Sequence, residues 1–205
     1  MKSLILEKRL VPVVAISDAS KAAELASALV AGGLPIAEIT LRTPASLEAL
    51  RIAANNNDLL VGVGSLRNSE DLKKALDAGA KFAVSAGYSP SVAVEASRQG
   101  IPYFPGVSTP TEILQAINEG ITTLKFFPAQ TLGGVSALKA MSAPFPGITF
   151  MPTGGITAAN ARDYLALSPV VAIGGSWMVA QKLIDAGDFE AIVSLTKEAV
   201  EVCAL

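Results

Sequence analysis

Short apolar runs, separated by longer amphipathic segments, recur along the whole chain. Eight such runs begin 20 to 27 residues apart, and most are rich in β-branched residues. They cover residues 11–16, 36–41, 60–65, 82–86, 103–107, 123–128, 150–154 and 170–175. Parallel strands that are buried on both faces of a sheet give nearly continuous apolar runs of this kind. The pattern therefore predicts eight parallel strands.

The segments between these runs carry helix start and stop signals. Residues 109–120, "TPTEILQAINEG", have Thr109 as an N-cap, Pro110 at the first helical position and Gly120 as a stop. Residues 17–33 and 68–80 also open with capping residues and close near glycine. Two helical segments, 178–187 and 188–205, follow the last run, and we expect the second to pack as the eighth helix.

Eight strands that alternate with helices at an even spacing favour one fold. We predict an α/β protein in which residues 1–205 form a single compact (β/α)8 TIM barrel. An open doubly wound sheet is the alternative, but it typically has a glycine-rich fingerprint after its first strand. The segment "AISDASKA" at that place contains no glycine.

Composition excludes several classes of protein. The chain is 51% hydrophobic with a mean hydropathy of +0.47, yet no apolar run is long enough to span a membrane. Charges at residues 7–9 interrupt the first apolar stretch, so we expect no signal peptide. The net charge is −2 and both signs are scattered, which predicts no nucleic-acid partner and no membrane partner. The single cysteine, Cys203, allows no internal disulfide and fits a reducing cytoplasm.

The chain contains no histidine. Imidazole metal sites, Ser-His triads and histidine general bases are therefore excluded. Acid–base chemistry would fall to Asp, Glu, Lys, Tyr or Cys, and we expect neither a metal nor a cofactor.

Active sites of such barrels lie at the carboxyl ends of the strands, where the polar residues are few. Glu38 is the only carboxylate within the eight predicted strands, and it shares a strand face with Thr40 and Arg42. Ser65 ends the third run, and Lys125 lies in the sixth, on the same face as Phe127. A purely structural pair of Glu38 with Arg42 or Lys125 is the alternative, although buried ion pairs are weak evidence for stability.

Two glycine pairs lie at the ends of the last two predicted strands, in "PTGGIT" (152–157) and "GGSW" (174–177). Glycine lets backbone N–H groups approach an anion closely, and helices that follow would offer unpaired N–H groups at their N-termini. The loops after strands 7 and 8 of a barrel frequently bind phosphate. The pattern favours a phosphate site over two simple tight turns.

Lys125 is the candidate nucleophile. Its neighbours along the chain are apolar, Phe126, Phe127 and Pro128, and we expect them to favour the uncharged amine that can attack a carbonyl. The other lysines fall in helical or connecting segments or near the N-terminus. Glu38 would then move protons. Together with a phosphate site, this predicts metal-free cleavage of a carbon–carbon bond in a phosphorylated keto compound.

Five segments carry a family resemblance: "EITLRTPASLEAL", "FPGVSTPTEI", "LKFFPA", "MPTGGI" and "GGSWM". In this order they resemble the class I aldolases that cleave 2-keto-3-deoxy-6-phosphogluconate (KDPG) to pyruvate and glyceraldehyde 3-phosphate. Many of these enzymes also cleave 4-hydroxy-2-oxoglutarate (KHG) to pyruvate and glyoxylate. The resemblance implies a cytoplasmic homotrimer of the Entner–Doudoroff sugar-acid pathway. It also implies a phosphorylated 2-keto acid as substrate.

The resemblance implies a role for each candidate residue. Lys125 would form the Schiff base with the substrate C2 ketone, and Glu38 would act as general acid and base. Arg42 would bind the substrate carboxylate with help from Ser65, and Phe127 would line the pocket. The phosphate would be bound by the remaining site residues, Thr153, Gly154, Gly155 and Ser176.

The chain departs from the usual family pattern at three positions. Ser65 stands where the family usually has Thr, Ala86 where it usually has Pro, and Gln130 where it usually has Glu. We expect the reaction class to survive these changes.

Three other functions stay open at this point. An aldolase specific for the galactonate epimer differs from the first hypothesis only at the substrate C4 centre. A phosphosugar isomerase or epimerase would use Glu38 for proton transfer without a Schiff base. A non-catalytic barrel would only bind a phosphorylated metabolite.

Overall fold

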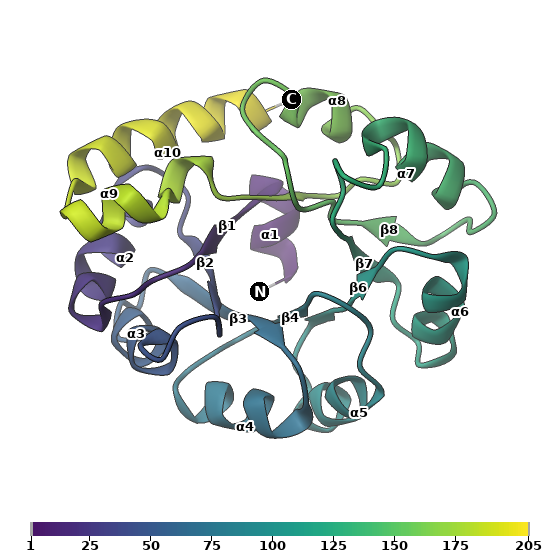
Figure 1. The fold of residues 1–205 in the computed structure, drawn as a ribbon, viewed down its shortest axis with the longest axis horizontal. Coiled ribbons are helices and arrows are strands. Elements are labelled where there is room, and N and C mark those ends of the chain that lie inside the picture. Colours follow the sequence, from purple (N-terminus) through teal and green to yellow (C-terminus); the bar gives the residue numbers. More distant parts are fainter. Residues whose placement is uncertain (1, 205) are drawn as a thin grey trace.

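The computed structural model describes residues 2–204 as a ring of parallel strands surrounded by helices (Figure 1). The strands are β1 (Leu10–Val14), β2 (Ile36–Thr40), β3 (Leu60–Leu66), β4 (Ala83–Ser85), β5 (Tyr103–Phe104), β6 (Gly106–Val107), β7 (Thr123–Phe126), β8 (Thr149–Phe150) and β9 (Ile173–Gly175). They pair in two sheets, in the orders β5-β4-β3-β2-β1-β9 and β6-β7-β8. Two isolated parallel bridges connect the strands β8 and β9. Phe150 of β8 pairs with Val170, just before β9, and Thr153, just after β8, pairs with Gly174 of β9. The predicted (β/α)8 fold is confirmed.

Each of the eight predicted strands is present, although most are shorter than their apolar runs. The fifth run is divided into β5 and β6 at Pro105. Proline has no backbone N–H and interrupts a ladder of hydrogen bonds. Its carbonyl still accepts a hydrogen bond from the Lys125 N–H at 2.8 Å, so the chain stays attached to β7.

The helices lie outside the ring, as the βα alternation predicts (Figure 1). They are α2 (Ala22–Ala31), α3 (Ser46–Ala53), α4 (Ser69–Asp77), α5 (Pro90–Gln99), α6 (Pro110–Asn118), α7 (Gly134–Ser142), α8 (Ala161–Leu165), α9 (Gln181–Ala186) and α10 (Phe189–Cys203), with short 3-10 turns η1 (Ala19–Lys21) and η2 (Trp177–Val179). The predicted start of α6 is confirmed, because Thr109 and Glu112 form a capping box. Helix α10 packs against α2 and α8, so the prediction of an eighth outer helix is also confirmed.

An N-terminal helix, α1 (Lys2–Lys8), was not predicted from the sequence. It precedes β1 and lies across the opening of the ring in Figure 1. Its Ile5 side chain is buried. The charged residues that interrupt the apolar stretch mark the end of this helix, where the Arg9 guanidinium donates a hydrogen bond to the Leu165 carbonyl at 2.9 Å. The helix thus covers the barrel interior at the amino ends of the strands.

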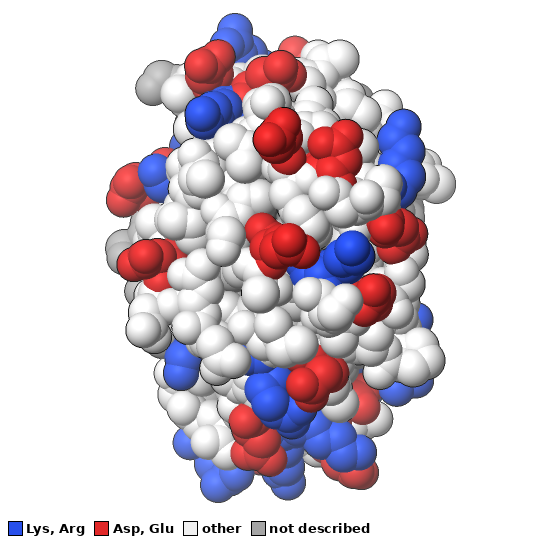
Figure 2. Space-filling model, turned by 90° about the vertical axis from the view of Figure 1, so that its left-hand side faces the viewer, with Lys and Arg blue, Asp and Glu red and all other residues white. Residues whose placement is uncertain are grey.

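No helix in residues 2–204 has the length and hydrophobicity needed to cross a membrane. On the face that Figure 2 shows, acidic and basic side chains lie intermixed around a largely uncharged area. This distribution agrees with the scattered charges of the sequence.

Two glycines on β3 create space inside the ring. A Cβ atom added at Gly62 would overlap the Phe82 ring, and one added at Gly64 would overlap the Glu38 carboxylate. Phe82 also packs edge-to-face against Phe104, with ring centroids 6.3 Å apart. The absence of two side chains on β3 therefore makes room for a core aromatic ring and for a charged group.

We predict that Gly62→Ala destabilises the protein, because the added methyl group overpacks the core against Phe82. The expected loss in the free energy of unfolding is roughly 1–3 kcal/mol. Urea denaturation measures it. Gly87→Ala is the matched control, since a Cβ atom at Gly87 meets no atom within 4 Å. Equal stability of the two variants would contradict this account of the interior.

Candidate active site

Lys125 on β7 and Glu38 on β2 meet inside the barrel. Their Nζ and Oε1 atoms lie 3.2 Å apart, and the residues are only 3% and 0% exposed. The partner of Glu38 is therefore Lys125 and not Arg42, the other possibility that the sequence left open. Proton transfer between the two groups needs no rearrangement at this distance.

The surroundings of the pair combine a polar and an apolar side. The ring centroid of Phe127 lies 5.4 Å from Lys125 Nζ, within the range of a cation–π contact. Glu38 Oε2 is buried and has no hydrogen-bond partner among the described residues. That oxygen is free to accept a proton or a hydrogen bond from a bound molecule.

The apolar run around Lys125 surrounds the amine only in part. Neighbouring side chains on a strand point to opposite faces, so the buried Phe126 lies on the helix side of the ring. Phe127 alone supplies the aromatic contact to the amine.

A cavity of about 470 Å³ opens at the carboxyl ends of the strands, next to this pair. Six predicted site residues line it: Arg42, Phe127, Thr153, Gly154, Gly155 and Ser176. Lys125 and Glu38 are not among the lining residues, but Phe127 both lines the cavity and contacts the Lys125 amine. The structure thus brings the predicted phosphate residues and Arg42 into one space.

Ser65 does not line this cavity, but it contacts a residue that does. Its Oγ atom accepts a hydrogen bond from Arg42 Nε at 3.2 Å. Ser65 adopts a left-handed backbone conformation with φ of 61°, which is strongly unfavourable for a β-branched residue. Ser, which is not β-branched, therefore suits this backbone conformation better than the Thr that is usual at this position in the family that the sequence resembles.

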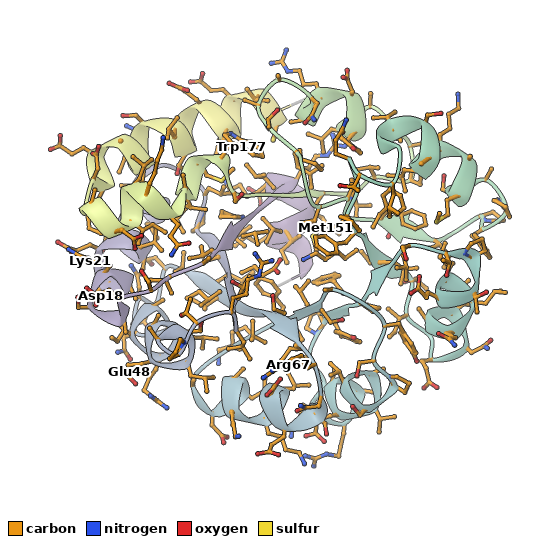
Figure 3. The ribbon with its side chains drawn as sticks, viewed as in Figure 1. Asp18, Lys21, Glu48, Arg67, Met151 and Trp177 are labelled. Atoms are coloured by element: carbon orange, nitrogen blue, oxygen red, sulfur yellow. The ribbon has the colours of Figure 1, made fainter. Side chains whose placement is uncertain are left out.

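Several residues that line the cavity were not predicted from the sequence. Val13 and Ala15 come from the first predicted strand, and their apolar side chains carry no functional signal. Trp177 follows β9 at the rim of the ring (Figure 3), and its indole occupies the space that a side chain at position 175 would need. The "GGSW" motif could have indicated this contact, because a tryptophan ring packs closely against the backbone where a nearby glycine has no side chain. The second glycine pair of the predicted phosphate site, Gly174 and Gly175, also lines the cavity, and the other lining residues not predicted are Ile156, Val179, Ala180 and Gln181.

The prediction that a helix N-terminus follows each glycine pair is wrong for the first pair, whereas the 3-10 turn η2 begins at Trp177, just after the second pair. Helix α8 begins only at Ala161, and the chain after β9 enters the short turn η2. Gly154 and Gly155 instead adopt positive φ angles of 101° and 74° in a loop. The loop backbone, and not a helix terminus, is the source of N–H groups there.

The other two departures from the family pattern lie outside the cavity lining. Gln130 Oε1 accepts a hydrogen bond from the Tyr164 hydroxyl at 2.9 Å, behind the Gly154–Gly155 loop. Burial raises the pKa of Tyr164, so its hydroxyl keeps the proton that it donates. The Ala86 carbonyl packs where a side chain at Gly106 would lie.

In residues 2–204, no three or more His, Cys, Asp or Glu side chains come together as a possible metal site. The charged groups at the site are Lys125, Glu38 and Arg42.

Comparison with known proteins gives matches over nearly the whole chain. A sequence profile for "KDPG and KHG aldolase" matches residues 1–195. The chain is 42% identical to the KHG/KDPG aldolase of Escherichia coli K12 over 201 residues, 98% of this chain and 94% of that protein. It is 44% identical to the 2-dehydro-3-deoxy-phosphogluconate aldolase of Dickeya dadantii over 191 residues, 93% of this chain and 90% of that protein.

A solved structure agrees with these matches. It is the KDPG aldolase of Legionella pneumophila, with pyruvate captured at low pH as a covalent carbinolamine intermediate. The TM-score is 0.91 at 36% identity, and the alignment covers 95% of each chain. The profile match and the identity to these relatives place this chain in the KDPG and KHG aldolase family.

Proposed function

We propose that this protein is a class I aldolase that cleaves KDPG to pyruvate and glyceraldehyde 3-phosphate. The observation that carries the proposal is the buried Lys125–Glu38 pair at 3.2 Å, next to a cavity lined by Arg42 and two glycine-rich loops. Membership of the aldolase family supports it.

Lys125 acts first. Transfer of its proton toward Glu38 leaves a neutral amine, whose lone pair attacks C2 of the keto acid and forms a carbinolamine. Glu38 then returns this proton to the hydroxyl group of the carbinolamine, water leaves, and an iminium ion, the Schiff base, remains. The positive nitrogen draws electrons from the neighbouring carbon–carbon bond.

Glu38 governs the next step. Its carboxylate removes the proton of the substrate C4 hydroxyl, and the C3–C4 bond breaks. The electron pair of that bond forms the C2–C3 double bond and neutralises the iminium nitrogen, which gives an enamine. Glyceraldehyde 3-phosphate leaves. Protonation of the enamine at C3, followed by hydrolysis, releases pyruvate and restores the Lys125 amine.

The cavity residues hold the two ends of the substrate. Arg42, oriented by Ser65, binds the carboxylate through charge-assisted hydrogen bonds. The terminal phosphate lies against the loops of Thr153, Gly154, Gly155 and Ser176. Phe127 lines this space and packs against the amine.

The same groups would cleave KHG to pyruvate and glyoxylate, since KHG has the same C2 ketone and C4 hydroxyl and carries a C5 carboxylate in place of the C5 hydroxyl and C6 phosphate of KDPG. We further infer the homotrimer and the cytoplasmic location that the family resemblance implies. Sedimentation of the purified protein tests the trimer.

We predict that borohydride reduction in the presence of pyruvate attaches one pyruvate-derived group to Lys125. Peptide mass spectrometry locates the group. Lys125→Ala should lose both the adduct and the KDPG cleavage activity, because no other described lysine lies beside Glu38. Lys139→Ala, which removes an exposed lysine on α7, is the control and should retain both.

An active wild type without any adduct would contradict the Schiff base and favour a phosphosugar isomerase or epimerase. A wild type that binds phosphorylated ligands but turns nothing over would favour the non-catalytic barrel. Cleavage rates on the gluconate and galactonate epimers decide between the two aldolase specificities.

We also predict that Glu38→Gln lowers kcat for KDPG cleavage by roughly 10²- to 10⁴-fold, the usual contribution of a general acid–base group. The amide keeps the shape of the side chain but does not accept the C4 proton. Circular dichroism should show an intact fold. Glu48→Gln replaces an exposed carboxylate on α3 and should leave kcat unchanged. A Glu38→Gln enzyme as fast as the wild type would remove Glu38 from the mechanism.

A further inference from the structure

The carbonyl groups of the loop that follows β8 are fixed by donors from the segment after β7. The Ala129 N–H donates to the Thr153 carbonyl at 2.8 Å, and the Gln130 N–H donates to the Gly154 carbonyl at 3.0 Å. A peptide group is planar and its C=O and N–H point in opposite directions. The N–H groups of Gly154 and Gly155 therefore point away from these donors.

The third carbonyl of the loop is held by a side chain instead. Asn160 Nδ2 donates to the Gly155 carbonyl at 3.1 Å, and Asn160 Oδ1 accepts from the Thr157 N–H at 2.8 Å. The same planarity directs the Ile156 N–H away from Asn160. Ile156 lines the cavity together with both glycines.

None of the N–H groups of Gly154, Gly155 and Ile156 donates a hydrogen bond to another described residue, and all three residues line the cavity. A concave row of backbone N–H groups is a preferred anion site. Two of these groups are oriented by backbone hydrogen bonds, which a substitution does not remove. The third depends on one side chain that is partly exposed and lies outside the cavity lining.

We propose that Asn160 is a positioning residue for the terminal phosphate of the substrate. Its amide orients the Gly155–Ile156 peptide so that the Ile156 N–H joins the anion cradle. This inference rests on the proposed function and extends it: Asn160 sets the preference for phosphorylated over unphosphorylated 2-keto acids without touching either.

The test compares Asn160→Ala and Asn160→Asp with the wild type on two substrates. Neither variant donates to the Gly155 carbonyl, whereas the Asp variant keeps an acceptor for the Thr157 N–H. We expect KM for KDPG to rise on the order of tenfold in both, the range of one hydrogen bond to a charged group. Because KHG carries no phosphate, kcat/KM for KHG should stay unchanged. Asn68→Asp is the matched control, since Asn68 Oδ1 likewise accepts a backbone N–H, that of Asp71, and Asn68 lies outside the cavity lining.

A second readout does not depend on turnover. Calorimetric titration with inorganic phosphate should show weaker binding in both Asn160 variants than in the wild type and in Asn68→Asp. Unchanged phosphate affinity and an unchanged KM for KDPG would overturn the inference. An equal fall in kcat/KM on both substrates would also overturn it, because Asn160 would then be merely structural. Failure of the wild type to cleave KDPG would refute the proposed function, and the phosphate titration would still decide the role of Asn160.

Discussion

A lysine and a glutamate held together in the interior of the barrel are the constraint on which the rest of the structure depends. Taking such a pair out of water costs several kcal/mol for each ion, and apolar residues of similar volume often stabilise a fold as well or better. The chain nevertheless accommodates Lys125 and Glu38 by leaving Gly64 without a side chain. One carboxylate oxygen remains without a partner among the described residues. These features fit a group that exchanges protons with a substrate better than a stabilising contact.

The barrel places the two groups proposed to react with the substrate apart from the residues proposed to bind it. The Lys–Glu pair lies inside the ring, whereas Arg42 and the glycine-rich loops lie at the carboxyl ends of the strands around the cavity. Loops can vary there while the strands that carry the reactive groups stay fixed. Under the proposed function, the bond is cleaved inside the ring, and the residues at the carboxyl ends of the strands select the substrate.

Much of this could be predicted from the sequence because the signals were local. The apolar runs and capping residues gave the strands and most helices, and strand alternation placed Glu38 and Lys125 inside one ring. Helix α1 was missed because charges interrupt its short apolar stretch. Val13 and Ala15 carry no chemical signal, and the role of Asn160 depends on a loop conformation that spacing does not reveal. The sequence also could not show that Glu38 pairs with Lys125 and not with Arg42, because that depends on how β2 and β7 face each other across the ring.

The central claim is that the Lys125 amine forms a covalent bond to the carbonyl carbon of its substrate. A crystal structure of the protein soaked with pyruvate tests it most directly. Continuous electron density from Lys125 Nζ to pyruvate C2, with the Glu38 carboxylate beside the bond, is the expected result. Pyruvate bound without a covalent link, or attached to another lysine, would contradict it.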